Sequence, residues 1–406
     1  MLTLEQFKAA RSVLRGVIRD TSLIHSTALS KSTGHNVYLK PENMQVTGAY
    51  KIRGAYYKIS TLSQEEKERG LITASAGNHA QGLAYAAQAA GVPATIVMPT
   101  TTPLVKVNNT KDYGANVVLH GEVFDDAAEL AAKLSEEQGL TYVHPFNDLT
   151  LATGQGTIAY EIFQDLPDVD IILVPIGGGG LAAGVSTLAK LLNPNVTVIG
   201  VEPAGAASMK ASLEAGHVVT LPTINTIADG VAVKTPGDKI FPYIQKNIDD
   251  IITIHDDELV DAFLDMMERH KMIVENAGLL PIAALHHLNC KGKNIVPVLS
   301  GGNMDVITVS SLVQHGLINR GRVFTFSVLL PDRPGELVRV AEIVARENGN
   351  IIKLEHNQFV NINRQSGVEL RVTLEAFGHT HKRTILTAMR AAGYDAREVN
   401  TGDFYD

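Results

Sequence analysis

In the first part of the chain, two patterns of apolar and polar positions follow each other in turn. Short continuous apolar runs are typical of buried strands, and the segments between them repeat apolar side chains at helical spacing. Glycines directly after these periodic segments are typical helix stops. The predicted strands are 71–74, 94–98, 116–119 and 141–144, and the predicted helices are 79–90, 104–113 and 124–138. Strands that alternate with helices predict a parallel sheet with helices on its faces.

A second series of the same kind begins with a helix near Thr153. It continues with a strand at 171–176, a glycine loop at 177–180, a helix at 181–192, and strands at 196–201 and 295–299. Residues 1–19 read as an amphipathic helix, and 37–40 as a further strand. The two series predict a two-lobed α/β protein, and the cleft between two such lobes is a common ligand site.

The tail has a different element order. From Arg322 onward the predicted elements are strand 323–330, helix 336–348, strands 351–359 and 367–374, helix 380–392 and strand 395–399. This βαββαβ order is the ferredoxin-like arrangement, which needs about 80 residues. Residues 315–321, with two glycines, an asparagine and an arginine, are the predicted linker.

Composition limits the classes of partner. The chain has 406 residues, of which 45% are hydrophobic and 19% charged, so it can bury the cores of two or three domains. Its net charge of -8 disfavours nucleic acid and anionic membranes as partners. Cys290 is the only cysteine, which excludes a disulfide within the chain and fits a reducing cytoplasm. No apolar run approaches membrane-spanning length.

Lys51 is the candidate catalytic residue. It follows Thr47, Gly48, Ala49 and Tyr50 where a helix is expected to begin, with Thr47 as the predicted N-cap. A partly desolvated ammonium near the positive end of a helix dipole loses proton affinity, which favours the neutral amine that a Schiff base requires. Lysine is also the side chain that anchors pyridoxal phosphate. A lone lysine at a helix start is more often a solvated residue, so the interpretation depends on its companions.

Two loops have the placement of anion sites. The run Gly177–Gly180 lies between a buried strand and a helix, where close amides and the helix dipole favour a phosphate. Neither a Walker lysine nor kinase signatures follow it, and a tight turn without ligand is the alternative. The segment Ser75-Ala76-Gly77-Asn78-His79 has the same placement and could hold a carboxylate with its amides. A capped helix without ligand is the alternative here, and a lone His79 is more often a structural helix histidine.

A third loop, Ser300-Gly301-Gly302-Asn303, closes the strand at 295–299. A hydroxyl at this place can face a neutral ring nitrogen, whereas an aspartate would keep that nitrogen protonated. A neutral pyridine is a weaker electron sink, which suffices for an α,β-elimination with a departing hydroxyl. Otherwise Ser300 is a turn residue, as serine before two glycines usually is.

Together these segments resemble the fold-type II pyridoxal-phosphate enzymes, whose fold is like that of the tryptophan synthase beta chain. Within them the threonine dehydratases (threonine ammonia-lyases) are most similar. The resemblance implies a catalytic domain at 1–318, with a smaller lobe at roughly 48–147. It also implies pyridoxal 5'-phosphate as cofactor and deamination of L-threonine to 2-oxobutanoate and ammonia, with slower conversion of L-serine to pyruvate.

The same resemblance implies a role for each motif. Lys51 would be the Schiff-base lysine and Asn78 the partner of the cofactor's phenolic oxygen. The run Gly177, Gly178, Gly179 and Gly180 would cradle the phosphate, and Ser300 would face the ring nitrogen. The substrate carboxylate would be held by Ser75, Ala76, Gly77 and His79. Tyr50 stands where many relatives have phenylalanine and would contribute to the cofactor site.

Serine racemases share nearly all of these features and are the alternative enzyme. Racemases of this family carry a second serine directly after the first, and here that residue is Ala76, which cannot transfer a proton. Their divalent-cation site resembles Glu202, the Ala206 carbonyl and Ser208, but a serine is a poor ligand where they have a carboxylate. The resemblance therefore implies at most a weak cation site. A third hypothesis is an amino-acid-sensing protein without catalysis.

The tail resembles an ACT domain over 322–406. The resemblance implies an amino-acid effector at Asp332, Arg333, Pro334 and Gly335, bound at a subunit interface, and hence a homo-oligomer such as a dimer or tetramer. A dimerisation module without ligand is the alternative. A role in threonine breakdown and a role in isoleucine synthesis both fit the sequence.

Overall fold

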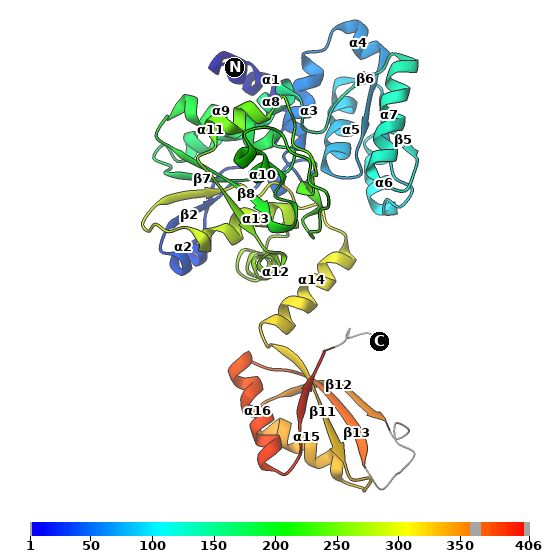
Figure 1. Cartoon of the computed structure of the whole chain (residues 1–406), viewed down its shortest axis with the longest axis vertical. Helices are drawn as coiled ribbons and strands as arrows, with labels where there is room; N and C mark the ends of the chain where they lie inside the picture. The colour runs from blue at the N-terminus through cyan, green and yellow to red at the C-terminus, as the bar shows by residue number, and fades with distance from the viewer. Residues whose placement is uncertain (1, 358–366, 402–406) are drawn as a thin grey trace. The chain divides into compact units, whose positions relative to one another are not determined.

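The structure of the chain is a computed structural model, which describes residues 2–357 and 367–401. It divides into two compact units, one ending at Asp305 and one beginning at Val306. Each unit is coloured by residue number in Figure 1. Across the described ranges, no helix combines the length and the apolar character needed to cross a membrane.

The first unit contains two sheets, and the larger has the order β1-β2-β10-β7-β8-β9. Its strands are β1 (Ile24–His25), β2 (Asn36–Leu39), β7 (Ile171–Pro175), β8 (Thr197–Pro203), β9 (Asp250–Ile254) and β10 (Asn294–Pro297). Only β1 pairs antiparallel with its neighbour; the pairs from β2 to β9 are parallel. Every residue of β7 is buried, as its continuous apolar run predicts for a strand covered on both faces.

The smaller sheet has the order β5-β4-β3-β6 and is parallel throughout. Its strands are β3 (Leu71–Ala74), β4 (Ala94–Met98), β5 (Asn116–Leu119) and β6 (Thr141–Tyr142). The helices α5 (Asn78–Ala90), α6 (Leu104–Asp112) and α7 (Phe124–Gln138) alternate with these strands, as Figure 1 shows. The predicted parallel βαβ series is therefore confirmed, and Gly91 and Gly139 end α5 and α7 in the left-handed conformation.

Helices α8 (Leu149–Asp165) and α9 (Gly180–Leu192) pack closely in the larger lobe. A Cβ at Gly184 would lie 2.0 Å from the Ala152 carbonyl oxygen, and one at Gly54 would lie 2.6 Å from the Leu151 oxygen. Glycine at these positions lets helix backbones approach each other. The close approach at Gly54 holds α3 (Lys51–Ser60), the helix that starts at the candidate lysine, against α8.

The remaining elements of the first unit surround these sheets. They are α1 (Leu4–Leu14), α2 (Thr27–Thr33), η1 (Glu42–Met44), α4 (Gln64–Arg69), η2 (Ala204–Ala206), α10 (Ser208–Ala215), η3 (Asp229–Val231), α11 (Phe241–Asn247), α12 (Asp256–Asp265), η4 (Met266–His270), α13 (Asn276–Ala284) and η5 (Leu285–His287). No element was predicted between residues 204 and 294, where the structure has β9 and several short helices.

Several expectations about element ends, and the expected linker, are wrong. Thr47 does not cap α3, because its hydroxyl donates to the Ala49 carbonyl at 3.4 Å and Tyr50 is the N-cap residue. The helix expected near Thr153 begins at Leu149, since the Asp148 side chain accepts from the amides of Thr150 and Leu151. The linker expected at 315–321 is largely helical, because α14 runs from Val306 to Asn319.

The second unit is an antiparallel sheet with the strand order β12-β13-β11-β14. Its elements after α14 are β11 (Val323–Leu330), α15 (Glu336–Arg346), β12 (Asn350–Asn357), β13 (Val368–Glu375), α16 (His379–Ala391) and β14 (Arg397–Val399). The predicted βαββαβ order is confirmed. Phe324, Phe326, Val340 and Ile385 belong to one buried core that joins the sheet to both helices.

Candidate functional site

A cavity of about 600 Å³ in the first unit collects the residues that the sequence singled out for cofactor and substrate. Its lining includes Tyr50, Lys51, Ser75, Ala76, Gly77, Asn78, His79, Gly177, Gly178, Gly179, Gly180 and Ser300. These residues come from segments far apart in the sequence. Their individual roles stay predictions, but the structure places them around a single space.

Lys51 is the first residue of α3, and its Nζ donates to the Pro145 carbonyl oxygen at 2.8 Å. The same nitrogen lies 5.4 Å from the centre of the Tyr50 ring. Burial lowers the pKa of Lys51 from 10.5 to about 8, although the nearby Glu275 opposes this shift. The amine therefore loses its proton more easily than an exposed lysine does, which is the direction predicted for a buried lysine at a helix start.

Two helices begin at this cavity without a side-chain cap. The N-cap residue of α5 is Gly77 and that of α9 is Gly179, and neither start has a side-chain hydrogen bond to its amides. Such unsatisfied N–H groups, at the positive end of a helix dipole, suit a carboxylate or a phosphate. The residues present therefore fit a cofactor that carries a phosphate and a substrate that carries a carboxylate.

The glycine loop needs glycine for packing as well as for amide exposure. A Cβ at Gly178 would lie 2.1 Å from the Phe146 ring, and one at Gly177 would lie 2.8 Å from the Val231 Cα. Gly179 has a φ of +96°, a conformation that strains other residues. Any larger side chain in this loop would displace the backbone that begins α9.

Ser300 follows the end of β10 and is 3% exposed. Its carbonyl accepts from the Tyr50 amide at 3.0 Å, and the adjacent Gly301 forms a β-bridge with Ala49. These backbone contacts join the loop after β10 to the residues directly before Lys51. The hydroxyl predicted for the ring nitrogen and the amine predicted for the covalent bond are thereby held in one local structure.

Two histidines next to Lys51 are neutral. Burial, reinforced by the Lys51 charge, lowers the pKa of His79 to about 3, and its Nε2 donates to the Val143 carbonyl at 3.2 Å. Burial also lowers the pKa of His144 to about 4, and its Nδ1 accepts from the amides of Phe146 and Asn147. The His79 side chain thus has a structural bond to Val143, so it is the amides at the start of α5 that suit a carboxylate.

Several residues of the cavity received no role from the sequence, among them the polar residues Glu275 and Asn303. Glu275 precedes α13, is 7% exposed, and accepts from the Asn78 side chain at 2.7 Å. Burial, with a contribution from Asp229, raises the pKa of Glu275 to about 8. Asn303 ends the Ser-Gly-Gly-Asn motif, so the sequence could have indicated it as a site residue. Glu275 belongs to no motif, and the only sequence feature that marks it is an acidic residue beside an apolar segment.

A buried ion cluster lies behind the lysine helix. It consists of Lys40, Glu42, Arg53 and Glu161, with Arg53 on α3 and Glu161 on α8. The Arg53 guanidinium reaches Glu42 at 2.8 Å and Glu161 at 2.5 Å, and Lys40 pairs with Glu161 as well. Burial tends to raise the pKa of Glu161, but Arg53 and Lys40 outweigh it and lower the pKa to about 2.

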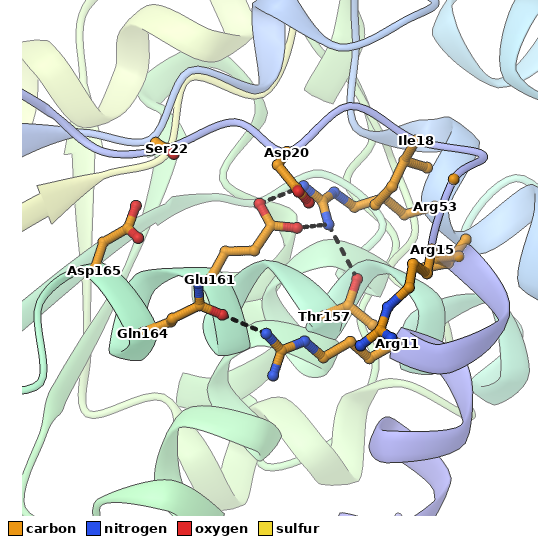
Figure 2. A pocket seen from close by; sticks show the side chains of 12 residues that line it. Arg11, Arg15, Ile18, Asp20, Ser22, Arg53, Thr157, Glu161, Gln164 and Asp165 are labelled. Carbon is orange, nitrogen blue, oxygen red and sulfur yellow. Dashed lines mark hydrogen bonds and ion pairs between the residues drawn. The ribbon is translucent and has the colours of Figure 1, made fainter.

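A second pocket, of about 400 Å³, opens beside this cluster. Figure 2 shows Arg53 directed at Glu161 and Thr157, and Arg11 of α1 hydrogen-bonded to Gln164. Its lining carries charges of both signs, and no residue predicted for cofactor or substrate belongs to it. The cluster connects α3 to α8 on a side of α3 that does not line the larger cavity.

The residues of the weak cation site are close in the chain, but Glu202 has other partners. Its carboxylate accepts from the amides of Met209 and Lys210, at 2.9 and 2.8 Å, where α10 begins. The Ser208 hydroxyl is buried and has no hydrogen-bond partner among the described residues. Residues 2–357 and 367–401 contain no group of three or more His, Cys, Asp or Glu arranged to hold a metal ion. Binding of a weak cation at Glu202, Ala206 and Ser208 stays a prediction.

The predicted effector turn belongs to the second unit. Gly335 is the N-cap residue of α15, has a φ of +96°, and gives that helix no side-chain cap. A Cβ at Gly335 would meet no atom within 4 Å, so the turn is open on that side.

The chain is similar to known proteins over most of its length. Residues 14–301 match a family model described as pyridoxal-phosphate dependent enzyme. An L-threonine ammonia-lyase of Thermotoga maritima is 44% identical over 400 residues, which cover 98% of this chain and 100% of that protein.

Solved structures show the same similarity. Threonine deaminase isoform 2 of Solanum lycopersicum aligns with a TM-score of 0.74 at 42% identity, over 77% of this chain and 86% of that one. Maize serine racemase aligns with a TM-score of 0.73 at 34% identity, over 78% of this chain and 98% of that one. With a lysine, uncapped helix starts and a glycine loop around one cavity, the chain belongs to the family of pyridoxal-phosphate dependent enzymes.

Proposed function

We propose that this enzyme deaminates L-threonine to 2-oxobutanoate and ammonia by α,β-elimination, and L-serine to pyruvate more slowly. The observation that carries the proposal is the single cavity in which Lys51, the start of α5, the glycine loop and Ser300 meet. The similarity to an L-threonine ammonia-lyase over 98% of the chain supports threonine as the substrate.

Each part of the cavity has a proposed task. Lys51 would hold the cofactor through its amine, and the free amine would take the Cα proton of the substrate. Gly177–Gly180 and the start of α9 bind the cofactor's phosphate, Asn78 donates to its phenolic oxygen, and Ser300 faces its ring nitrogen. Ser75 and the amides that follow it bind the substrate carboxylate, which orients the amino acid over Lys51.

The cofactor, when bound, supplies an electron sink for the negative charge that develops at the substrate's Cα. The protein's contribution is a base of suitable strength. Because burial lowers the pKa of Lys51 to about 8, a useful fraction of the free amine is unprotonated near neutral pH. Loss of the β-hydroxyl as water leaves an enamine, which takes up water to give the 2-oxo acid and ammonia.

The decisive experiment supplies the purified enzyme with L-threonine and measures 2-oxobutanoate and ammonia. We expect equal amounts of the two products from the unaltered chain and no turnover above background from Lys51→Ala. Lys58→Ala, a substitution of another lysine on the same helix, is the control and should stay active. Normal turnover by Lys51→Ala, or a chain that produces no 2-oxobutanoate, would reject the proposal.

Serine racemisation is the second candidate, favoured by the similarity to maize serine racemase. Ala76 stands against it, because a methyl group cannot carry a proton to the opposite face of the substrate. Incubation with L-serine separates the two reactions: pyruvate without appreciable D-serine supports elimination, and D-serine as a main product supports racemisation. A protein that binds threonine and releases no product would be the non-catalytic sensor.

We further propose that residues 322–406, which lie within the second unit, form an ACT domain and that residues 1–318 form the catalytic domain. The βαββαβ order and the open turn at Asp332–Gly335 support an amino-acid effector at this unit. A homo-oligomer and a cytoplasmic location complete the proposal. The response of the intact enzyme to added amino acids is the test of the regulatory part.

A further inference from the structure

A line of side-chain hydrogen bonds runs along the lining of the cavity and joins four separate segments of the first unit. Asn303 Nδ2 donates to the Thr47 carbonyl oxygen at 2.8 Å and to Asn78 Oδ1 at 2.9 Å. Asn78 Nδ2 in turn donates to Glu275 Oε1 at 2.7 Å. The line therefore begins in the loop before Lys51 and ends at the residue that precedes α13.

The donor and the acceptor of every bond in this line follow from the bond to the Thr47 carbonyl oxygen. A backbone carbonyl can only accept, so the Asn303 atom that faces Thr47 must be the amide nitrogen. Because that nitrogen also faces Asn78, the Asn78 atom there must be the oxygen, and the Asn78 nitrogen must face Glu275. One N–H of Asn78 is then used by Glu275, and among the described residues the other N–H has no acceptor.

The Glu275 carboxyl has little freedom to move. Its own amide donates to the Gly301 carbonyl at 3.0 Å, and the residue is 7% exposed. A Cβ added at Gly301 would lie 2.3 Å from Glu275 Oε1 and 3.0 Å from Asn78 Nδ2. The carboxyl and the amide are thus packed against backbone as a unit, and glycine at 301 leaves the space that they occupy.

We propose that Glu275 and Asn303 are positioning residues that hold the Asn78 amide in one orientation, which reserves its second N–H as a donor for the cofactor. This inference rests on the proposed function, since Asn78 as a cofactor partner belongs to that proposal. An asparagine without these two partners would rotate about χ2 and present oxygen or nitrogen to the cavity. Held at both ends, it presents a donor only.

The chemistry of Glu275 makes glutamine its conservative replacement. Burial raises the pKa of Glu275 to about 8, so the side chain is mostly the uncharged acid at neutral pH. It then accepts the Asn78 N–H through a carbonyl oxygen, and a glutamine amide offers the same oxygen at the same distance from the backbone. Alanine offers no acceptor.

The test uses full-length enzyme loaded with pyridoxal phosphate and compares Asn78→Ala, Glu275→Ala, Glu275→Gln and the double alanine variant. The two readouts are the cofactor dissociation constant and the position of the visible absorbance band. We expect each single alanine variant to weaken cofactor binding about tenfold and to shift the band, as for loss of a hydrogen bond to a polar anchor. The double variant should bind the cofactor about as well as the single variant with the larger loss of affinity, because both substitutions remove the same interaction.

Glu275→Gln should keep both the affinity and the band of the unaltered enzyme. Gly301→Ala displaces Glu275 Oε1 without removing it and should shift the band in the same direction as Glu275→Ala. Glu137→Ala, an exposed glutamate of α7, is the matched control and should change neither readout. Far-ultraviolet circular dichroism of each variant identifies loss of folding, and Glu275→Gln and Gly301→Ala still decide the question if Glu275→Ala does not fold.

The outcomes separate this inference from the proposed function. Additive losses in the double variant, or equal losses in Glu275→Gln and Glu275→Ala, would overturn the positioning role while leaving Asn78 as a cofactor partner. An Asn78→Ala enzyme with the affinity and absorbance of the unaltered enzyme would overturn both, because Asn78 would then have no task for Glu275 to support.

Discussion

Lys51 is deprotonated so easily because its amine is removed from water without a carboxylate at bonding distance. Its Nζ donates to the Pro145 carbonyl, a neutral acceptor that stabilises the charged form less than an anion would. The acid whose charge acts on it is Glu275, and burial keeps that acid largely uncharged near neutrality. The lowered pKa of Lys51 therefore belongs to its surroundings and is present before any cofactor binds.

The first prediction follows at the scale of this residue. In the cofactor-free enzyme, acylation of Lys51 by an amine-specific reagent should increase with pH and reach half of its maximum near pH 8, because the neutral amine reacts and its pKa is lowered to about 8. Mass spectrometry of the peptide that contains Lys51 measures the extent of reaction.

Lys8 is the internal reference for that experiment. Its pKa is raised from 10.5 by the hydrogen bond to Glu5, so its acylation should increase only at higher pH. A common midpoint for Lys51 and Lys8 would show that the cavity does not lower the pKa of Lys51.

At the scale of elements, the ion cluster fixes helix α3 in place from behind the cavity. Arg53 stands two residues after Lys51 and reaches Glu42 in η1 and Glu161 in α8. Two buried cations, Lys40 and Arg53, share two carboxylates, so the cluster is balanced only while both acids are present. A buried pair of this kind is costly to break because the partner charge stays in the interior.

Glu161→Ala should therefore lower the free energy of unfolding by about 3 to 5 kcal/mol, the usual cost of leaving buried charge uncompensated. Urea unfolding followed by circular dichroism measures the change. The control is Glu137→Ala, whose carboxylate pairs with Lys133 on the surface, and its effect should stay below about 1 kcal/mol. Equal effects of the two substitutions would mean that the cluster adds no stability.

The same carboxylate predicts the response of stability to acid. The pKa of Glu161 is lowered from 4.5 to about 2, so its contribution to folding is complete above pH 4.5 and is lost as the pH falls toward 2. Glu161→Gln has no carboxylate at this position, so its stability does not include a contribution that protonation could remove. Unfolding free energies measured from pH 5 to pH 2 should fall less steeply for Glu161→Gln than for the unaltered chain, and parallel slopes would contradict this account.

At the scale of the whole molecule, the proposed effector site lies in the second unit, and none of the described residues of that unit is among those that line the cavity around Lys51. If an amino acid binds the second unit and acts on catalysis, isoleucine or valine should shift the threonine concentration at half saturation by about 5- to 150-fold. Gly335→Leu should remove that shift and leave the basal activity unchanged, because it places a strained side chain at the open start of α15.

Gly393→Leu is the matched control for Gly335→Leu. Gly393 also has a positive φ and no atom within 4 Å of an added Cβ, and it lies in the same unit between α16 and β14. The Gly393→Leu enzyme should keep the response. Loss of the response in both variants, or in neither, would place the effector elsewhere and favour an assembly role for the second unit.

The sequence by itself determined the elements whose signal is local. Continuous apolar runs such as 171–175 are typical of buried strands in a covered sheet, and glycines such as Gly91 end helices by their left-handed backbone conformation. The βαββαβ tail was predictable for the same reason. The motifs around Lys51, Ser75, Gly177 and Ser300 were also visible, because each joins a strand to a helix or loop within a few residues.

Only the tertiary structure decided the features that depend on distant partners. Thr47 was wrongly predicted as the cap of α3 because its loop pairs with Gly301, which is remote in sequence, and the helix begins later. Glu275 carries no motif, and its hydrogen bond to Asn78 exists because the fold brings residues 197 positions apart into contact. The partners of Arg53 are likewise set by packing. The pKa values of Glu275 and Glu161 depend on how each carboxyl is buried and on partners that only the folded chain brings together.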